Sequence, residues 1–407
     1  MTPPSLSQAS MNSTITSDDV SMSAKEIELT ILMPCLNEAE TLARCVAEAM
    51  AALELHHIHG EVVIADNGST DGSQDIAAKL GARVTPVLEK GYGCALRGGI
   101  AAARGRYILM GDSDASYDFT HADRFLVKLR EGYEVVMGNR FLGGIQPGAM
   151  RWKNRHIGNP LLSGIGRLFF QCPVGDFHCG LRAFSKACVN RLDLRTSGME
   201  FASEMVIKAT LFKARITEVP TTLRPDGRNR KPHLRPWRDG WRHLRFMLLF
   251  SPRWLFLQPG VALMGLGLVA SALLISGPLT VRSITFDVHT LFFAAMAILI
   301  GFQSVAFAIF TKVFAIQSGL MPPDKKFSRW LGWINLEKGL VVGGLFVIAG
   351  LAVSMEAVGL WSNQGFGSLA PGELLRWVIP GGVMLTLGCQ IVLVSFFLSF
   401  LGLSIER

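Results

Sequence analysis

Four long apolar runs after residue 254 constrain this chain more than any other feature of its sequence. They cover about residues 255–276, 291–316, 339–361 and 377–403, and each is nearly free of charge. A helix needs about 20 apolar residues to cross roughly 30 Å of hydrocarbon. One such run could be a buried helix in a soluble core, but four in sequence could not. The pattern therefore predicts a membrane domain of about four transmembrane helices over residues 255–407.

The positive charge of the chain is concentrated just before these runs. The formal net charge is +8, and the segment from Arg224 to Arg253 holds nine basic and two acidic residues, a net charge of +7. Within it, four apolar residues recur at helical spacing and three arginines fall on another stripe: Trp237, Trp241, Leu244, Leu248, and Arg238, Arg242, Arg245. This pattern predicts a basic amphipathic helix over 233–254 that lies in the membrane interface. A charge this local does not indicate nucleic-acid binding.

The remaining basic residues predict the orientation of the chain. The loop between the second and third runs carries Lys325, Lys326, Arg329 and Lys338, whereas the other two loops hold little positive charge. By the positive-inside rule, the N-terminal region and this loop are cytoplasmic, in a multi-pass protein of the inner (plasma) membrane. Residues 1–25 are rich in Ser and Thr, show no signal peptide and predict a disordered tail. Seven cysteines without metal-type spacing predict free thiols.

Residues 26–232 alternate between strand-like and helix-like patterns. The expected strands are 29–33, 61–65, 83–87, 107–110 and 135–138, with helical patterns at 75–80 and 96–104 among those between them. This rhythm predicts an α/β fold with a mainly parallel sheet and helices on both faces. In such sheets the ligand binds beyond the carboxyl ends of the strands.

Polar motifs follow three of these strands. Asp112 and Asp114 come after the fourth strand, and alternate carboxylates there can share one hard cation such as Mg²⁺ or Mn²⁺. Such an ion could neutralise a diphosphate leaving group. The stretch 66–71 lacks the acidic pattern of a calcium loop, and Leu96 stands where a dinucleotide fingerprint needs its third glycine.

Four motifs occur together in a specific order: PCLNE at 34–38, DNGSTD at 66–71, KGYG at 90–93 and DSD at 112–114. Over about residues 28–250 the chain resembles the family 2 glycosyltransferases of GT-A fold, in particular the polyprenyl-phosphate (dolichol-phosphate) mannosyl- and glucosyltransferases. Three downstream segments extend the resemblance: GNR at 138–140, DFHCGLR at 176–182, and GMEF at 198–201 with Glu204.

The resemblance implies roles for individual residues. The nucleotide-sugar donor would be bound by Pro34, Asn37, Glu38, Asp66, Asp71, Lys90, Gly91 and Asp112. The metal would be bound by Asp112, Asp114 and Ser116, although Ser116 stands where relatives often have Gln, so a water could take its place. Acceptor-phosphate candidates are Arg140, Arg182, Arg224 and Arg228, of which Arg140 and Arg182 join Asp112 and Asp114 as catalytic candidates. Asp176, Glu200 and Glu204 would orient these arginines or contact the sugar.

The function implied is inverting transfer of a hexose from a GDP- or UDP-linked donor to a polyprenyl phosphate at the cytoplasmic face. A different lipid or polysaccharide acceptor is one alternative, although no Arg-Trp pair here has the Gln of the Gln-x-x-Arg-Trp element of polysaccharide synthases. A non-enzymatic transporter of lipid-linked sugars is the other, and the scarcity of charge in the four runs disfavours it. A homo-oligomer is left open.

Overall fold

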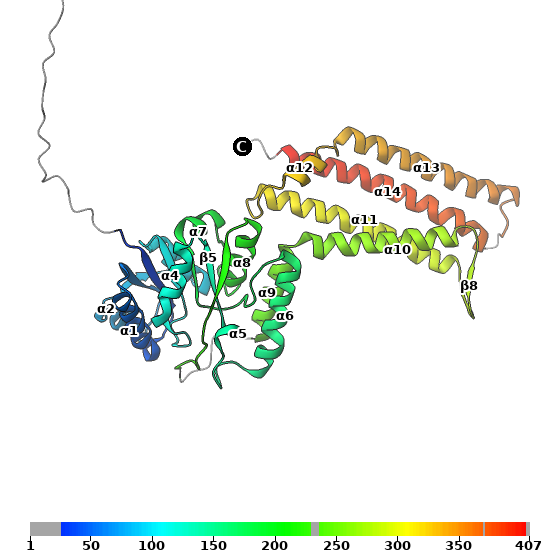
Figure 1. Cartoon of the computed structure of the whole chain (residues 1–407). Helices are drawn as coiled ribbons and strands as arrows, with labels where there is room; N and C mark the ends of the chain where they lie inside the picture. The colour runs from blue at the N-terminus through cyan, green and yellow to red at the C-terminus, as the bar shows by residue number, and fades with distance from the viewer. Residues whose placement is uncertain (1–25, 229–235, 369–370, 404–407) are drawn as a thin grey trace, which may run out of the picture.

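The computed structural model describes residues 26–228, 236–368 and 371–403. The tail predicted over 1–25 lies outside the described residues, as do Arg230, Lys231 and Arg235 of the basic segment. The chain forms two parts that lie end to end: a sheet unit (residues 26–228) and a bundle of long helices (residues 253–403), with one helix at the junction (Figure 1).

The sheet unit is built on seven strands in the order β3-β2-β1-β4-β6-β5-β7. Their bounds are β1 Leu29–Cys35, β2 Gly60–Asp66, β3 Arg83–Pro86, β4 Tyr107–Met110, β5 Val135–Asn139, β6 Arg182–Ser185 and β7 Ile216–Pro220. Strand β6 runs antiparallel to both neighbours, β4 and β5, and every other pairing is parallel. The predicted fold class, a mainly parallel sheet in an α/β unit followed by a helical membrane part, is confirmed.

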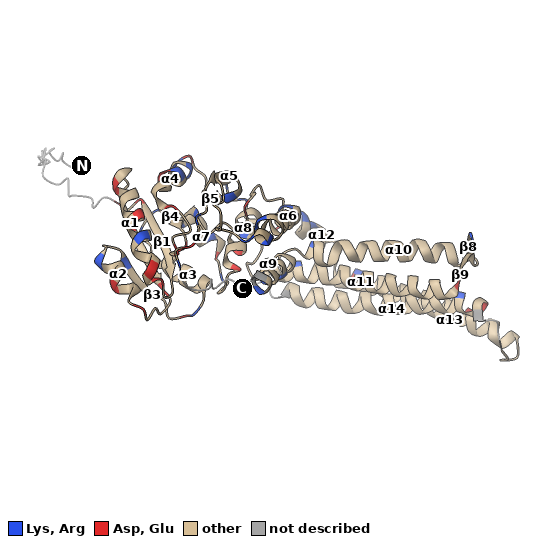
Figure 2. Cartoon of the chain, turned by 90° about the horizontal axis from the view of Figure 1, so that it is seen from below, with Lys and Arg blue, Asp and Glu red and all other residues tan. Residues whose placement is uncertain are grey.

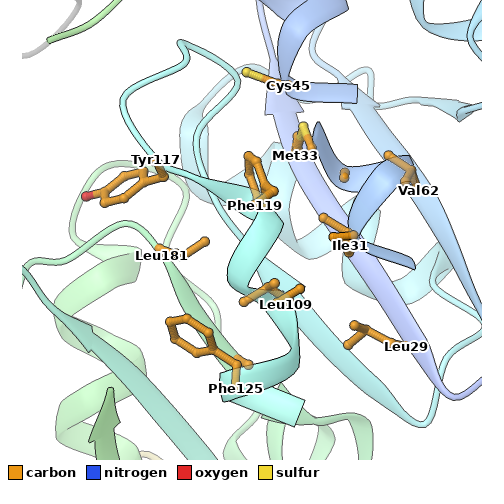
Figure 3. Packing of buried hydrophobic residues seen from close by; sticks show 14 of the residues in the cluster. Leu29, Ile31, Met33, Cys45, Val62, Leu109, Tyr117, Phe119, Phe125 and Leu181 are labelled. Atoms are coloured by element: carbon orange, nitrogen blue, oxygen red, sulfur yellow. The ribbon is translucent and has the colours of Figure 1, made fainter. Parts of the chain in front are cut away.

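Helices cover both faces of this sheet, and β1 shows why. Leu29, Ile31 and Met33 point into one buried cluster (Figure 3), while Leu32 points into a second cluster on the opposite face. The helices of the unit are α1 Ala39–Leu55, α2 Ser73–Lys79, α3 Tyr92–Ala102, α4 Ala122–Arg130, α5 Arg140–Gly143, α6 Asn159–Phe170, α7 Lys186–Leu192 and α8 Phe201–Leu211. Since successive strand residues face opposite sides, a strand buried on both faces reads as a continuous apolar run.

Two strands of this sheet were not predicted. β6 has the sequence RAFS and β7 has ITEVP, and neither is an apolar run long enough to be recognised alone. Their pairing partners supply what the local sequence lacks, because β5 lies between them and is fully buried. The helix predicted over 96–104 begins earlier, at Tyr92, because the backbone of Gly91 turns at φ +135° and starts the helix there.

Helix α9, Pro236–Leu249, lies within the range 233–254 where an amphipathic helix was expected. The limits of the domains at residues 232 and 254 stay a prediction. Helix α9 buries His243 and Met247 against the sheet unit and leaves Trp237 91% and Trp241 58% exposed. Helix α6, entered through a π-helical turn, packs against α9 (Figure 1). The helix, this turn and the residues just before the turn also expose apolar side chains, which the sequence reading did not single out: Trp152, Ile157, Leu161 and Leu168.

Four helices are long and apolar enough to cross a membrane: Arg253–Leu274, Val288–Gln317, Leu336–Asn363 and Gly372–Gly402. The first comprises a π-helical turn and α10, and the others are α11, α13 and α14 (Pro371–Leu403). The prediction of about four transmembrane helices is therefore confirmed, while the residue limits predicted for them stay a prediction. Large apolar side chains along them stay exposed, for example Leu266, Phe293 and Leu393, as a lipid-facing surface requires and a soluble surface does not allow.

Two smaller elements join these helices. Helix α12, Lys325–Leu331, lies at the end of the bundle next to the sheet unit. A hairpin of β8, Leu279–Val281, and β9, Ile284–Phe286, joins α10 to α11 at the opposite end (Figure 1). The hairpin was not predicted, because its strands have three residues each.

Small residues set the distance between α13 and α14. A Cβ added at Gly350 would lie 2.6 Å from the backbone nitrogen of Leu385, and one added at Gly388 would lie 2.7 Å from the carbonyl oxygen of Gly343. Such contacts are impossible without moving backbone. Helices in lipid often pack through close backbone approach over small residues. The reason is that lipid is as apolar as their side chains, so no hydrophobic force drives the helices together.

We expect Gly350→Ala to lower the unfolding temperature of the detergent-solubilised protein by several degrees, because the new methyl must push α14 away, at about 1–3 kcal/mol. Gly344→Ala is the matched control, since a Cβ there meets nothing within 4 Å. Differential scanning fluorimetry compares the two. Equal unfolding temperatures for the two variants would contradict the packing described.

Candidate active site

The strand order brings three predicted motifs to one edge of the sheet. β2, β1 and β4 are neighbours and parallel, so the loops that follow them leave from the same edge. The loops are tied together: the side-chain oxygen Oδ1 of Asn37 accepts from the Thr70 N–H at 2.8 Å, and the Ser113 hydroxyl donates to the Pro34 carbonyl at 2.7 Å. Asn37 itself has φ +60°, a left-handed backbone that Asn tolerates better than most residues.

Asp66 and Asp71 hold these loops in shape. Asp66, which is buried, accepts from the N–H groups of Gly68 and Ser69 at 3.1 and 3.2 Å. Asp71 accepts at 2.9 Å from the N–H of Ala39, the first residue of α1. Burial alone would raise the pKa of Asp71, but hydrogen bonds from Ser73 and Ala39 outweigh it and lower the pKa. Both carboxylates therefore shape the loops at this edge of the sheet, and their contact with a nucleoside stays a prediction.

Asn67 links the second motif to the third. Its side-chain oxygen accepts from the Gly91 N–H at 2.8 Å, and its backbone carbonyl accepts from the Lys90 ammonium at 2.7 Å. A Cβ on Gly91 would lie 2.3 Å from the carbonyl oxygen of Ser197, so the close approach and the positive φ both require glycine. The sequence reading chose Lys90 and Gly91 and missed Asn67, although it stands inside the quoted motif.

Asp112 and Asp114 sit at the centre of the edge. The Tyr92 hydroxyl, at the start of α3, donates to Oδ1 of Asp112 at 3.0 Å. Burial, aided by the negative charge of Asp114, raises the pKa of Asp112 to about 6. Ala115, which follows Asp114, has φ +62°, a strained conformation for alanine, and backbone strain of this kind clusters at active sites.

A divalent cation fits this pair. Among the described residues no group of three or more His, Cys, Asp or Glu side chains could hold a metal ion. Mg²⁺, however, is usually bound by one or two carboxylates together with substrate phosphates and water, which is what two aspartates at an open strand end offer. The Ser116 hydroxyl donates to Oδ1 of Asp114 at 2.5 Å. Ser116 is therefore engaged with the carboxylate, and its contact with a metal stays a prediction.

Two of the predicted acceptor arginines lie on one segment that crosses the site. Arg228 contacts Oε2 of Glu38 at 2.9 Å and Oδ2 of Asp114 at 3.0 Å. Arg224 pairs instead with Glu48 at 2.8 Å and with Asp118. The structure therefore brings Arg228 to the aspartate pair and places Arg224 on the flank of α1.

The other two predicted arginines are buried. Arg140 forms a bidentate ion pair with Asp176, at 2.6 and 2.7 Å. This contact is consistent with the prediction that Asp176 orients an arginine. Arg182 is fully buried and donates to the backbone carbonyls of Cys179 and Ala202, and burial lowers its pKa. Both arginines fix the loop 176–181, and their contact with an acceptor phosphate stays a prediction.

Glu204 and Glu200 occupy different surroundings. Glu204 accepts from the backbone N–H groups of Arg195 and Thr196 at 3.0 and 2.8 Å, and it forms a buried ion pair with Lys208 at 2.9 Å. These contacts hold the loop that packs on Gly91. The Oε2 atom of Glu200 is buried and has no hydrogen-bond partner in the described part of the chain.

A histidine pair that sequence reasoning missed connects the loop 176–181 to α9. The Ser203 hydroxyl and Nδ1 of His243 are 2.8 Å apart, and the rings of His178 and His243 stand edge to face with centroids 4.6 Å apart. Burial lowers the pKa of His178, so its ring is neutral. The only available signal was His178 within the quoted motif at 176–182, because His243 is distant in sequence.

Comparison with known proteins identifies the family. Residues 30–192 match the family described as glycosyl transferase family 2, and residues 309–402 match its C-terminal transmembrane region. The low-salt glycan biosynthesis hexosyltransferase Agl6 of Haloferax volcanii is 37% identical over 92% of this chain and 89% of its own length. The chain belongs to glycosyltransferase family 2.

Further relatives from the same organism are more distant. Glycosyltransferase AglJ is 32% identical over 69% of this chain and 91% of its own length, and a dolichyl-phosphate hexose transferase is 27% identical over 48% and 83%. This family 2 glycosyltransferase is therefore an enzyme with a membrane part, as the sequence predicted.

We expect Asp176→Ala to destabilise this glycosyltransferase by about 3–5 kcal/mol, because it leaves the Arg140 guanidinium buried without its counter-charge. Glu28→Ala is the control: it removes the partner of Arg130 in an exposed pair, which is worth about 1 kcal/mol or less. Thermal unfolding followed by intrinsic fluorescence compares the two. Equal shifts in the unfolding temperature would contradict the importance of the buried pair.

The raised pKa of Asp112 predicts a pH dependence of metal binding. Protons compete with a cation for the ionised carboxylate, so affinity for Mn²⁺ should be constant well above pH 6 and fall roughly tenfold per unit below it. Titration of Mn²⁺ by electron paramagnetic resonance at a series of pH values measures this. An affinity that does not change through pH 6 would show that Asp112 is not a ligand.

Proposed function

We propose that this enzyme transfers a hexose, with inversion, from a GDP- or UDP-linked sugar to a polyprenyl phosphate at the cytoplasmic face of the membrane. The observation that carries the proposal is the pair Asp112 and Asp114 at the edge where the loops of β1, β2 and β4 are tied together. The position of the sheet unit at the end of four membrane-length helices supports the choice of a lipid acceptor.

The charges of Asp112 and Asp114 support a donor site at this edge of the sheet. Asp112 and Asp114 would hold a Mg²⁺ or Mn²⁺ ion, which when bound neutralises the diphosphate of the nucleotide sugar. The loops shaped by Asp66, Asp71 and Asn67 border this point and would receive the nucleoside. Lys90, exposed beside them, adds a positive charge.

The lipid acceptor would bind near the junction between the sheet unit and the helical bundle. The exposed tryptophans of α9 and the apolar side chains of α6 are suited to the headgroup region, where amphipathic aromatic rings concentrate. Figure 2 shows Lys and Arg residues gathered near α6, α9 and α12, at the end of the bundle that adjoins the sheet unit. This supports a cytoplasmic sheet unit and an interface that attracts an anionic lipid. The relative named as a dolichyl-phosphate hexose transferase supports the same acceptor class.

The reaction needs little acid–base help. A lipid phosphate is anionic at neutral pH and can attack the anomeric carbon directly: one phosphate oxygen forms the new bond to the sugar, and the nucleoside diphosphate leaves with the electrons of the old one. The harder task is to hold two anions close together. Cations on both sides, the metal and the arginines near Asp114 and Asp176, would meet it, since guanidinium groups match phosphate geometry.

We expect Asp114→Ala and Asp112→Ala each to reduce transfer by at least about a hundredfold. Purified enzyme is incubated with labelled GDP- or UDP-hexoses, Mg²⁺ and undecaprenyl phosphate, and the chloroform-soluble label is measured. Label that stays in the aqueous phase with every donor would reject a polyprenyl phosphate acceptor. If label enters lipid equally with the alanine variants, the enzymatic role of the aspartates is wrong.

A further inference from the structure

A short segment lies across the edge of the sheet unit that carries Asp112 and Asp114, which we call the donor edge. We call residues 221–228 the strap. It follows β7, forms a β-bridge between Leu223 and Tyr117, and donates the Arg224 N–H to the Ser116 carbonyl at 2.9 Å and the Gly227 N–H to the Asp114 carbonyl at 3.0 Å. The strap therefore runs along the loop that carries the aspartate pair.

The far end of the strap places a cation between two acids of the donor edge. The Arg228 guanidinium contacts Glu38, which follows β1, and Asp114, which follows β4, at 2.9 and 3.0 Å. All three side chains are largely buried: 11% exposed for Arg228, 5% for Glu38 and 13% for Asp114. Ion contacts shielded in this way are screened by salt much less than surface pairs.

Both oxygens of the Asp114 carboxylate are thereby engaged within the chain. Oδ1 accepts from the Ser116 N–H and hydroxyl at 3.1 and 2.5 Å, and Oδ2 contacts Arg228. A divalent cation that binds Asp114 must either share one of these oxygens with its present partner or displace that partner. Oδ2 is the one held by a positive charge, and a cation there would face the Arg228 guanidinium at short range, with strong repulsion.

We propose that Arg228 is an internal competitor of the divalent cation: the cation displaces it from Asp114, and the last residues of the strap leave the donor edge. The inference rests on the proposed function, because it takes Asp112 and Asp114 as the metal site. Arg224 is the fixed end of the strap. It pairs with Glu48 and Asp118, and a cation bound at Asp112 and Asp114 would not compete for these two carboxylates. The displaced guanidinium then stands beside the phosphates that the cation brings.

The first test measures Mn²⁺ binding to the purified full-length chain in detergent, with neither nucleotide sugar nor lipid, by electron paramagnetic resonance. We expect Arg228→Gln to bind Mn²⁺ about three- to tenfold more tightly than the unmodified protein, because the competing charge is gone while the side chain can still hydrogen bond. Arg224→Gln is the matched control from the same strap, and its affinity for Mn²⁺ should be unchanged. Unchanged or weaker binding by Arg228→Gln would overturn the proposal.

A second measurement separates displacement from simple removal of a nearby charge. Hydrogen–deuterium exchange on the unmodified chain follows the Gly227 amide, whose bond to the Asp114 carbonyl should open when Mn²⁺ is added, so that exchange at 226–228 accelerates several-fold. Exchange at 222–224, near the fixed end, should stay constant. If Mn²⁺ leaves exchange at 226–228 unchanged or slows it, the cation does not displace the strap and the proposal is wrong.

These readouts are independent of sugar transfer, so the two proposals fail in different ways. If Mn²⁺ binds and displaces the strap but no sugar reaches polyprenyl phosphate, the strap mechanism stands and the acceptor is wrong. If sugar is transferred while the unmodified chain and Arg228→Gln bind Mn²⁺ alike, the transferase stands and the competitor role of Arg228 is rejected.

Discussion

Parallel pairing of β1 with β2 on one side and β4 on the other is the constraint on which the rest of this structure depends. Hydrogen bonds along the two ladders put the ends of three strands in one row, and three loops with little in common then share an edge. Asp66, Asn37 and Asp112 come from different parts of the sequence, and only this register makes them neighbours. The buried apolar runs of the strands set the register, because a slip by one residue would turn every side chain to the wrong face.

The part of the site that could be predicted from sequence is the part encoded in short motifs. Asp112 and Asp114 stand two residues apart after an apolar strand, and that spacing is visible in the chain alone. The four membrane spans were equally accessible, since length and hydropathy are local properties. Strand β6 was not, because its four residues become a strand only by pairing with β4 and β5.

Long-range contacts account for what the sequence could not disclose. Asn67 was passed over because its importance comes from Lys90 and Gly91, which are more than 20 residues away. Arg182 and Arg140 look alike in sequence as basic residues in motifs, yet one is satisfied by carbonyl groups and the other by Asp176. Basic residues in this enzyme thus have surroundings that composition cannot separate: Arg140 and Arg182 are buried in the sheet unit, Arg228 pairs with Glu38 and Asp114, and others lie near the junction with the helical bundle (Figure 2).

The reversed direction of β6 has a consequence for how the family can vary. In the parallel strands the site loops follow the strand, but the loop 176–181 precedes β6 and reaches the same edge only because β6 runs the other way. The chain between α6 and β6 can therefore gain or lose residues without shifting the register of β1, β2 or β4. Under the proposed function, the loops that would bind the donor and the loop 176–181 beside Arg140 are in this sense separate, so one donor site can be combined with different acceptors.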